Sequence, residues 1–273
     1  MNKQTILTLT SAFVLAAFFA SCEDIIDVDL HSVEPELVIE GTVRMGEPAE
    51  VLITKTKDFD APNDYPPVTD AVVVISDDDA GNRETLFPNQ DGRYVAASIQ
   101  GTERHTYHLS VTYGGLEYTA TTYMPPRVEI DSLTLWKLPV KDIPDPQIHF
   151  VDPAGEENQY YRYVLRINGK QPLLQDRLED KVLSTENMDG IVIRLPLFIN
   201  YENSGRDDDP VKQGDVVTVE MQCLDKDVYR FFETLYDVGS AMANPVSNIK
   251  GGALGCFGAY SFTSKDVVME WDE

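Results

Sequence analysis

Residues 106–123 read TYHLSVTYGGLEYTATTY, and this stretch indicates the fold class more clearly than any other. In its first half, Tyr107, Leu109 and Val111 share one face of an extended chain, while the polar residues between them take the other face. This alternation is typical of an antiparallel strand with one buried face and one face in water. Gly114 and Gly115 supply a two-residue loop between the two runs, so the stretch predicts a β-hairpin.

Similar short runs, rich in Val, Ile, Thr and Tyr, surround this hairpin, and Gly, Pro, Asn and Asp separate them. Seven short strands in about 90 residues are typical of a β-sandwich of immunoglobulin-like or transthyretin-like type. The Cys…Trp…Cys spacing of true immunoglobulin domains is absent from the sequence. The predicted strands are residues 37–43, 50–56, 71–76, 84–87, 94–98, 106–113 and 116–123.

Consecutive prolines interrupt this pattern at residues 124–127, which read MPPR. Proline cannot donate a hydrogen bond to a neighbouring strand, so we place a domain boundary here, between a β-sandwich domain at 36–124 and a second domain at 128–273. The second domain is also expected to be β-rich. Its predicted strands are residues 128–138, 147–151, 160–167, 191–197, 216–224, 257–261 and 267–271.

One segment of the second domain has the periodicity of a helix. Val228, Phe231 and Leu235 recur at helical spacing, and either Asp225 or Asp227 can cap the first turn. We therefore predict a helix near 227–239 that packs one face on a sheet.

The first residues indicate export. Lys3 precedes an apolar stretch of about 15 residues, which is shorter than the roughly 20 needed to span a bilayer. Residues 1–21 therefore read as a signal peptide, and the small pair Ala20-Ser21 before Cys22 resembles a bacterial lipobox, in which the cysteine is acylated and becomes the new N-terminus. The alternative is an ordinary secretory peptide in which this cysteine is a coincidence.

Residues 22–35 read as an acidic tether. Glu23 and Asp24 follow the cysteine directly, and this placement resembles the surface-export signal of Bacteroidetes lipoproteins. The alternative is a solvated linker extended by its own charge. A chain with this N-terminus would hang from a lipid bilayer through acylated Cys22.

The chain is strongly acidic. Its 273 residues include 22 Lys and Arg against 46 Asp and Glu, for a formal net charge of −24. Such a charge repels polyphosphate, and no Lys/Arg cluster counters it locally, so we expect no nucleic-acid partner. The 42% hydrophobic content is sufficient for a folded core.

The sequence contains no GxSxG or HExxH motif, and a carboxylate pair suited to glycoside hydrolysis cannot be selected from 46 acids. Asp77 and Asp79 offer oxygen ligands for Ca²⁺, but a polar turn explains them better because the spacing does not match an EF-hand. His105 and His108 are expected at edge or surface positions. We therefore expect no enzymatic activity, no catalytic residue, no resident metal and no cofactor.

Cys223 and Cys256 lie in apolar surroundings of an exported chain. They can form a disulfide, because oxidation is possible outside the cytoplasm, or they can remain reduced core residues. The sequence leaves both readings open.

Several stretches together resemble a known family. They include residues 36–41 (ELVIEG), 70–75 (DAVVVI), 91–94 (DGRY), 248–252 (NIKGG) and 257–261 (FGAYS), besides Cys22 with its acidic tether. The chain resembles the Bacteroidetes lipoproteins called domain of unknown function 4249, from residue 22 to about residue 268. This resemblance implies a gene neighbourhood with TonB-dependent outer-membrane receptors, and it carries over no catalytic residue.

The leading functional prediction is an outer-membrane lipoprotein facing the cell exterior, which serves a TonB-dependent transporter as an accessory or ligand-capture partner. The alternative is a cell-surface adhesin or fimbria-like subunit, which would polymerise by donating an edge strand. A surface hydrolase with an unrecognised carboxylate site is the third reading.

Overall fold

The structure is a computed structural model that describes residues 34–58, 65–140, 143–155, 160–169, 182–186, 188, 190–198, 211–236 and 244–271. Residues 35–273 form one compact unit, and the fold below is the fold of that unit. The predicted signal peptide and nearly all of the predicted tether lie outside the described residues.

The described chain is mainly β, as predicted, with one short helix. Its strands are β1 (Leu37–Arg44), β2 (Pro48–Lys55), β3 (Val72–Asp77), β4 (Asn82–Pro88), β5 (Arg93–Gln100), β6 (Thr106–Tyr113), β7 (Leu116–Tyr123), β8 (Ser132–Trp136), β9 (Asp145–Val151), β10 (Tyr160–Ile167), β11 (Val182–Ser184), β12 (Val192–Pro196), β13 (Val216–Cys223) and β14 (Leu254–Val268), and the helix is α2 (Lys226–Tyr236).

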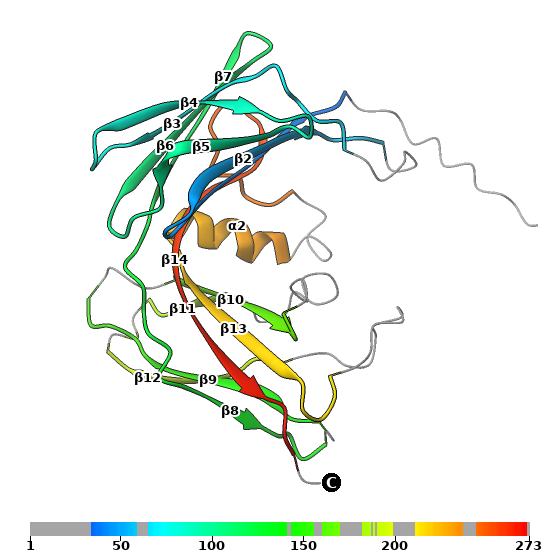
Figure 1. The fold of residues 1–273 in the computed structure, drawn as a ribbon, viewed down its shortest axis with the longest axis vertical. Helices are drawn as coiled ribbons and strands as arrows, with labels where there is room; N and C mark the ends of the chain where they lie inside the picture. The colour runs from blue at the N-terminus through cyan, green and yellow to red at the C-terminus, as the bar shows by residue number, and fades with distance from the viewer. Residues whose placement is uncertain are drawn as a thin grey trace, which may run out of the picture. The chain divides into compact units, whose positions relative to one another are not determined.

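The strands form two sheets. One has 11 strands in the order β11-β10-β13-β14-β1-β2-β5-β4-β3-β6-β7, and the other has three in the order β12-β9-β8. β14 pairs in parallel with β1 and antiparallel with β13. Through this strand the sheet is continuous from the first half of the sequence into the second, and Figure 1 shows β14 running from one group of strands to the other.

The hairpin that indicated the fold class has the predicted bounds. β6 and β7 pair antiparallel from Thr106 opposite Tyr123 to Tyr113 opposite Leu116. Gly114 and Gly115 have φ angles of 59° and 79°, which glycine adopts without strain and which a tight hairpin loop requires.

Two predicted elements differ from the structure, and one strand was not predicted. The predicted pair of C-terminal strands is a single strand of 15 residues, Leu254–Val268, because β1 pairs with its first part and β13 with its second. The strand predicted at 128–138 is limited to Ser132–Trp136, where β9 provides a partner. The three-residue β11 was missed, because it is defined only by its pairing with β10.

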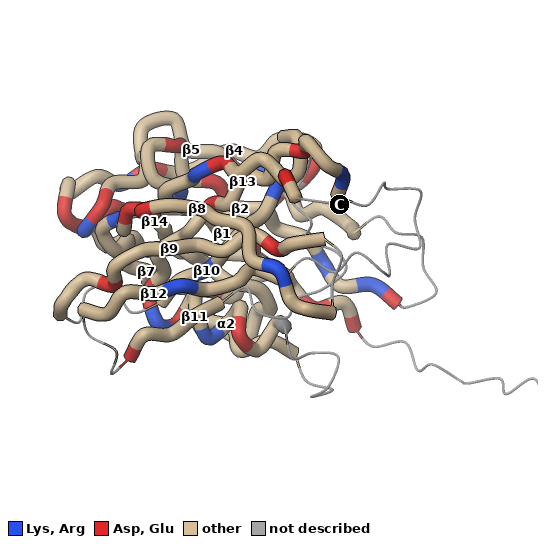
Figure 2. The backbone as a smooth tube through the Cα atoms, turned by 90° about the horizontal axis from the view of Figure 1, so that it is seen from below, with Lys and Arg blue, Asp and Glu red and all other residues tan. Residues whose placement is uncertain are grey.

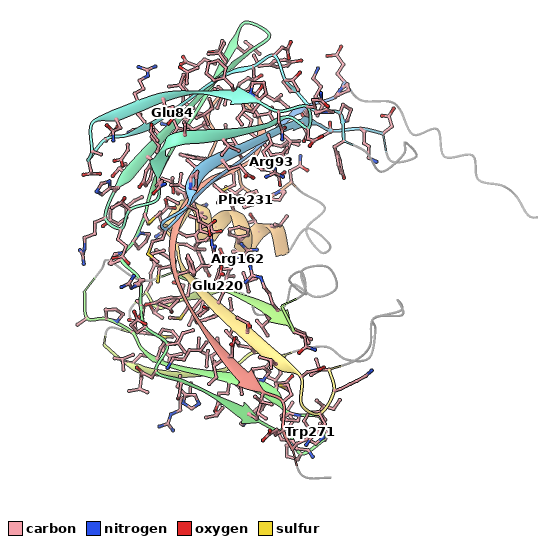
Figure 3. All side chains as sticks on the ribbon, in the orientation of Figure 1. Glu84, Arg93, Arg162, Glu220, Phe231 and Trp271 are labelled. Atoms are coloured by element: carbon pink, nitrogen blue, oxygen red, sulfur yellow. The ribbon has the colours of Figure 1, made fainter. Side chains whose placement is uncertain are left out.

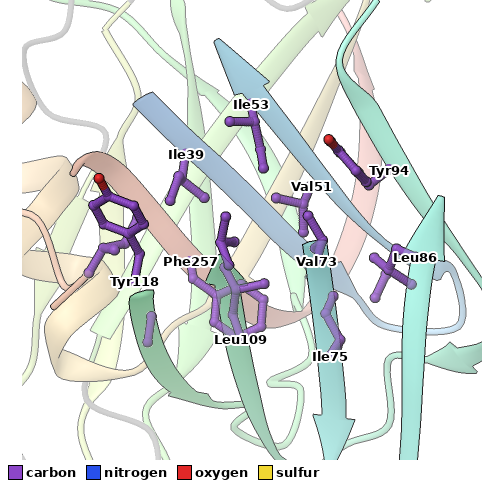
Figure 4. Packing of buried hydrophobic residues seen from close by; sticks show 14 of the residues in the cluster. Ile39, Val51, Ile53, Val73, Ile75, Leu86, Tyr94, Leu109, Tyr118 and Phe257 are labelled. Carbon is purple, nitrogen blue, oxygen red and sulfur yellow. The ribbon is translucent and has the colours of Figure 1, made fainter. Parts of the chain in front are cut away.

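Two large clusters of buried apolar side chains fill the unit. The first lies among β1, β2, β3, β5, β6 and β7, and it also receives Phe257 and Ala259 from β14 (Figure 4). The second lies between the three-stranded sheet and the strands β10, β13 and β14, with Phe150 and Tyr161 in edge-to-face contact at 5.1 Å between ring centres. Full burial of a side chain of this size contributes about 1.5–3 kcal/mol to stability.

A glycine allows β1 and β14 to approach each other. Gly255 has a φ of +99°, and a Cβ atom at this position would lie 2.1 Å from the backbone oxygen of Ile39. The junction of the two halves of the sheet therefore depends on the absence of a side chain here.

Candidate functional site

The predicted lipidation and export residues Cys22, Glu23 and Asp24 lie outside the described residues. Their roles stay predictions. Among the described residues, no helix has the length and apolar character that crossing a membrane requires.

The two aspartates considered for Ca²⁺ serve a turn between β3 and β4. Asp77 accepts a hydrogen bond from the N–H of Ala80 at 3.0 Å, and its carboxylate lies 2.9 Å from Nδ1 of His105. Asp79 accepts from the N–H of Thr106 at 2.7 Å. The described ranges contain no group of three or more His, Cys, Asp or Glu residues arranged to hold a metal ion.

Both histidines near this turn contact aspartates. His105 contacts Asp77 as above, and Nε2 of His108 lies 2.6 Å from the carboxylate of Asp78. The other ring nitrogen of His108 lies 2.7 Å from the hydroxyl of Thr121 on β7. Their role is to connect the turn to the β6–β7 hairpin.

Cys223 and Cys256 are both buried and both free thiols in the structure. Cys223 belongs to the second large cluster, whereas Cys256 packs beneath α2 with Leu224 and Val228. Burial raises the pKa of Cys223 to about 12 and also raises the pKa of Cys256, because a thiolate loses its hydration in an apolar environment.

A group of charged and polar side chains lies on the face of the 11-stranded sheet that α2 covers. We call it the arginine face and define it by Arg44 on β1, Arg162 and Arg166 on β10, and Glu220 and Gln222 on β13. Figure 3 shows Arg162 and Glu220 on the side of the sheet where α2 lies.

Strand register brings these residues together. Arg162 lies opposite Gln222, and Arg166 lies opposite Thr218, two pairs from Glu220 and on the same face of the sheet. Arg44 is the partner of Tyr260 on β14, the strand between β1 and β13. The side chains of Tyr161 and Tyr163, which alternate with these arginines on β10, enter the core instead.

Glu220 is the centre of the group, and its side chain is only 4% exposed. One of its oxygens accepts from Arg44 at 2.7 Å and from Arg166 at 3.2 Å. Its other oxygen accepts from the side-chain amide of Gln222 at 2.7 Å. A carboxylate at this depth requires such partners, because an unpaired buried charge is strongly unfavourable.

The electrostatic setting of Arg44 follows from the same contacts. Burial alone would lower its pKa, but the negative charges of Glu220 and Glu47 outweigh burial and raise the pKa. Arg44 therefore stays charged at neutral pH.

Aromatic rings fix two of the guanidinium groups. Arg44 lies over the ring of Phe262 with 3.8 Å to its centre, and Arg162 lies over the ring of Phe232 on α2 with 3.9 Å to its centre. Stacking of this kind occupies the planar face of a guanidinium and leaves its N–H groups directed along the edge.

The helix is held over the face by its first turn. Asp225, rather than Asp227, is the N-cap, since it accepts from the N–H of Val228 at 2.8 Å. Val228 is buried against the sheet, while Phe231 and Phe232 are half-buried beside the arginine face. The predicted helix is thus confirmed from Lys226 to Tyr236, and residues 237–239 of the prediction lie outside the described residues.

Sequence reasoning missed the arginine face. The available signal was the spacing of four between Arg162 and Arg166 on a predicted strand, which places both side chains on the same side. Their meeting with Arg44 and Glu220 depends on pairings between distant strands, and these are not visible in the sequence.

This arrangement favours binding over bond-making chemistry. Guanidinium groups donate hydrogen bonds and carry charge, but they do not exchange protons near neutral pH, so they cannot act as general bases. The fold and the site thus define a mainly β protein with a helix-covered, arginine-bearing sheet face.

The chain belongs to the family described as Domain of unknown function (DUF4249), which it matches over residues 23–266. This match covers the whole arginine face and α2. A search of curated proteins found no match to the chain.

Proposed function

We propose that this protein is an outer-membrane lipoprotein, anchored through acylated Cys22 and facing the cell exterior, that captures a ligand for a partner TonB-dependent transporter. In this proposal residues 22–35 are the tether, and Glu23 with Asp24 form the export signal. The body binds its ligand without transforming it.

The observation that carries the proposal is the arginine face. In a chain of net charge −24, it gathers guanidinium groups on the sheet face beside half-buried aromatic side chains of α2. Figure 2 shows Lys and Arg positions interspersed with Asp and Glu positions along the described chain. Convergent polar groups beside aromatic surface are typical of a ligand site.

Family membership supports the location and the partner. The lipobox-like Cys22 lies immediately before the matched range, and the acidic pair opens it. The family resemblance implies neighbouring genes for TonB-dependent receptors, which gives the partner its class.

The test is a crosslinked pull-down of the tagged protein from native outer membranes, followed by mass spectrometry. A TonB-dependent barrel in stoichiometric amount is the expected result, and the Cys22→Ser variant should lose both membrane association and the barrel. Protease shaving of intact cells should digest the wild-type protein. Purification without any barrel would refute the proposed partnership.

A fimbria-like structural subunit is the second candidate, and the β12 edge favours it. Val192 is 62% exposed, and Ile191 just before it is 41% exposed. β12 pairs with β9 on one side and ends its three-stranded sheet on the other. The β7 edge of the 11-stranded sheet is less suitable, because Thr119 of β7 exchanges two backbone hydrogen bonds with Lys250. Self-crosslinked ladders in place of a barrel would support this candidate.

A further inference from the structure

We propose that one end of the unit, where the chain enters it at Leu37, rests on the surface of a lipid bilayer. This inference rests on the proposed function, because it takes the bilayer that holds Cys22 as the partner, and it adds which part of the body faces that bilayer. The contact is made by four exposed side chains, which we call the entry-end patch: Tyr65, Val72, Phe87 and Leu116.

The patch consists of large side chains that a folded protein ordinarily buries. Phe87 is 80% exposed, Leu116 60%, Tyr65 59% and Val72 55%. Val95, which is opposite Phe87 on β5, is itself 47% exposed and extends the apolar surface. Apolar side chains that gather on one part of a surface are typical of a contact with a partner protein or a membrane.

Strand pairing brings the patch and the chain entry to the same end of the unit. β1 begins at Leu37 opposite Lys55, the last residue of β2. Nζ of Lys55 lies 5.1 Å from the ring centre of Tyr113 on β6, and Tyr113 is opposite Leu116 in the hairpin. The end of β6 also pairs with the start of β3, where Val72 lies. Leu116 and Val72 therefore lie at the end where the chain enters.

The two aromatic members of the patch belong to the same end. Tyr65 precedes Pro66, whose carbonyl accepts a hydrogen bond from the N–H of Lys55 at 3.0 Å. Phe87 is the last residue but one of β4, and antiparallel pairing places it beside Val72 at the start of β3. All four side chains are thus close to the point where β1 begins.

The covalent path to Cys22 argues for the bilayer as the partner. In the proposed function the acyl chains on Cys22 lie in the membrane, and residues 22–35 lead from there to the unit. A stretch of this length reaches at most about 50 Å when fully extended. The anchor therefore keeps the entry end near the lipid surface, which raises the effective concentration of lipid at the patch. A contact too weak to hold a free protein can form in the anchored one.

The residue types fit the boundary between lipid and water. At this boundary an aromatic ring lies against the acyl chains, while a lysine keeps its charge among the headgroups. Nζ of Lys57 lies 4.9 Å from the ring centre of Tyr65, and Lys55 lies over Tyr113 in the same way. A second copy of this chain is a poorer partner, because both copies carry a formal net charge of −24 and repel each other.

The test attaches the mature chain to phosphatidylcholine vesicles through the thiol of Cys22 and a maleimide-bearing lipid. Cys223 and Cys256 are buried, so Cys22 is the site of attachment. Phe87→Trp adds an emitting ring to the patch. Ala80→Trp is the matched control, because Ala80 is exposed in the turn at the opposite end of β3 and β4. The emission of the wild type is the common background.

Lipids that carry bromine high in their acyl chains quench a tryptophan that reaches the boundary. We expect the emission added by Phe87→Trp to shift to the blue and to be mostly quenched in such vesicles. The emission added by Ala80→Trp should be neither shifted nor quenched. This difference between the two variants measures which end of the unit faces the bilayer.

A charge placed within the patch should weaken the contact. Leu116→Glu brings a carboxylate to the boundary, where a charge is unfavourable, so the quenching of Phe87→Trp should decrease. Val151→Glu, at an exposed valine on β9 in the other sheet, is the control and should leave the quenching as it was. Circular dichroism confirms that each variant is folded.

Three results would overturn the inference. One is equal quenching of Phe87→Trp and Ala80→Trp, and another is unchanged quenching when Leu116→Glu is added to Phe87→Trp. The third is a blue shift of Phe87→Trp that needs no vesicles and grows with protein concentration, since this would assign the patch to contact between copies. The attachment is chemical and no transporter is present, so each of these results would leave the proposed acylation and the proposed partner intact.

Discussion

The hydroxyl of Thr122 donates a hydrogen bond of 2.6 Å to the carboxylate of Asp225, 103 positions further along the chain. The same carboxylate accepts from the backbone N–H of Tyr123 at 2.9 Å and caps α2 through the N–H of Val228. Thr122 in turn accepts from the N–H of Ala259 on β14 at 2.9 Å. One carboxylate thus joins β7, β14 and the helix that covers the arginine face.

Replacing this carboxylate should loosen the helix. Asp225→Ala removes the cap and leaves buried donors on β7 without an acceptor, so we expect a loss of about 2–4 kcal/mol in the free energy of unfolding. Asp227→Ala, two residues further on in the first turn, is the control and should cost less than about 1 kcal/mol. Urea titrations of both variants measure the difference, and equal losses would contradict the assignment of the cap.

Asp225 should also give the protein a specific pH dependence. Burial raises its pKa above the ordinary value of 3.8, although its hydrogen bonds with Thr122, Val228 and Tyr123 act in the opposite direction. Between the two pKa values the folded state binds more protons than the unfolded state, so this term lowers stability as the pH rises. The difference in unfolding free energy between the wild type and Asp225→Asn should therefore fall as the pH rises above 3.8. If this difference in unfolding free energy grew as the pH rises, folding would lower the pKa of Asp225 instead of raising it.

Glu220 should be needed for stability as well as for the shape of the arginine face. In Glu220→Gln the guanidinium groups of Arg44 and Arg166 lose their shared charged partner. Both arginines are partly exposed, so we expect a moderate loss of about 1–3 kcal/mol. Glu129→Gln, at a carboxylate that is 71% exposed and lies 3.2 Å from Arg127, should change stability by less than about 0.5 kcal/mol. Thermal and denaturant unfolding measure the loss of stability in each variant. Equal losses in the two variants would contradict this account.

The junction between β1 and β14 can be tested with two glycines of similar backbone conformation. Gly255→Ala would place a Cβ atom 2.1 Å from the oxygen of Ile39, so one of the two strands must move. Gly252 has a φ of +91° with no atom within 4 Å of an added Cβ, so Gly252→Ala should cost only about 1–2 kcal/mol of backbone strain. We expect Gly255→Ala to be far less stable or to remain unfolded, as judged by circular dichroism and yield. Similar behaviour of the two variants would show that close approach is unimportant there.

The two buried cysteines should be unreactive in the folded protein. Burial raises the pKa of Cys223 to about 12, so almost no thiolate is present at pH 8. In the Cys22→Ser variant, iodoacetamide should label neither remaining cysteine under native conditions and both in guanidinium chloride without reductant. Labelling only after reduction would instead demonstrate a disulfide between Cys223 and Cys256.

Local patterns in the sequence predicted the elements that are defined by their own residues. The hairpin of β6 and β7 was predicted within its true bounds, because its alternation and its Gly-Gly loop are both local signals. The helix was likewise predicted from its apolar spacing, with Asp225 as one of two possible caps. Such elements carry enough information within a few residues to specify their structure.

Elements defined by distant partners were predicted less well. The polar run from Thr263 to Asp266 reads as a loop, yet it is part of β14 because β13 pairs along it. Arg44 and Glu220 are 176 positions apart in the sequence, so no local sequence pattern predicts their contact. The candidate site is of this second kind, since three separate strands and α2 contribute to it.

The position of β1 has a mechanical consequence. It is the first strand of the unit, and it lies inside the large sheet with β14 on one side and β2 on the other. Tension on the chain preceding Leu37 would pull β1 along its own axis, so that the hydrogen bonds to both neighbours would be loaded together in shear rather than opened one at a time. A protein tethered at this end would resist the drag of flowing liquid through a strand that is hydrogen-bonded on both sides.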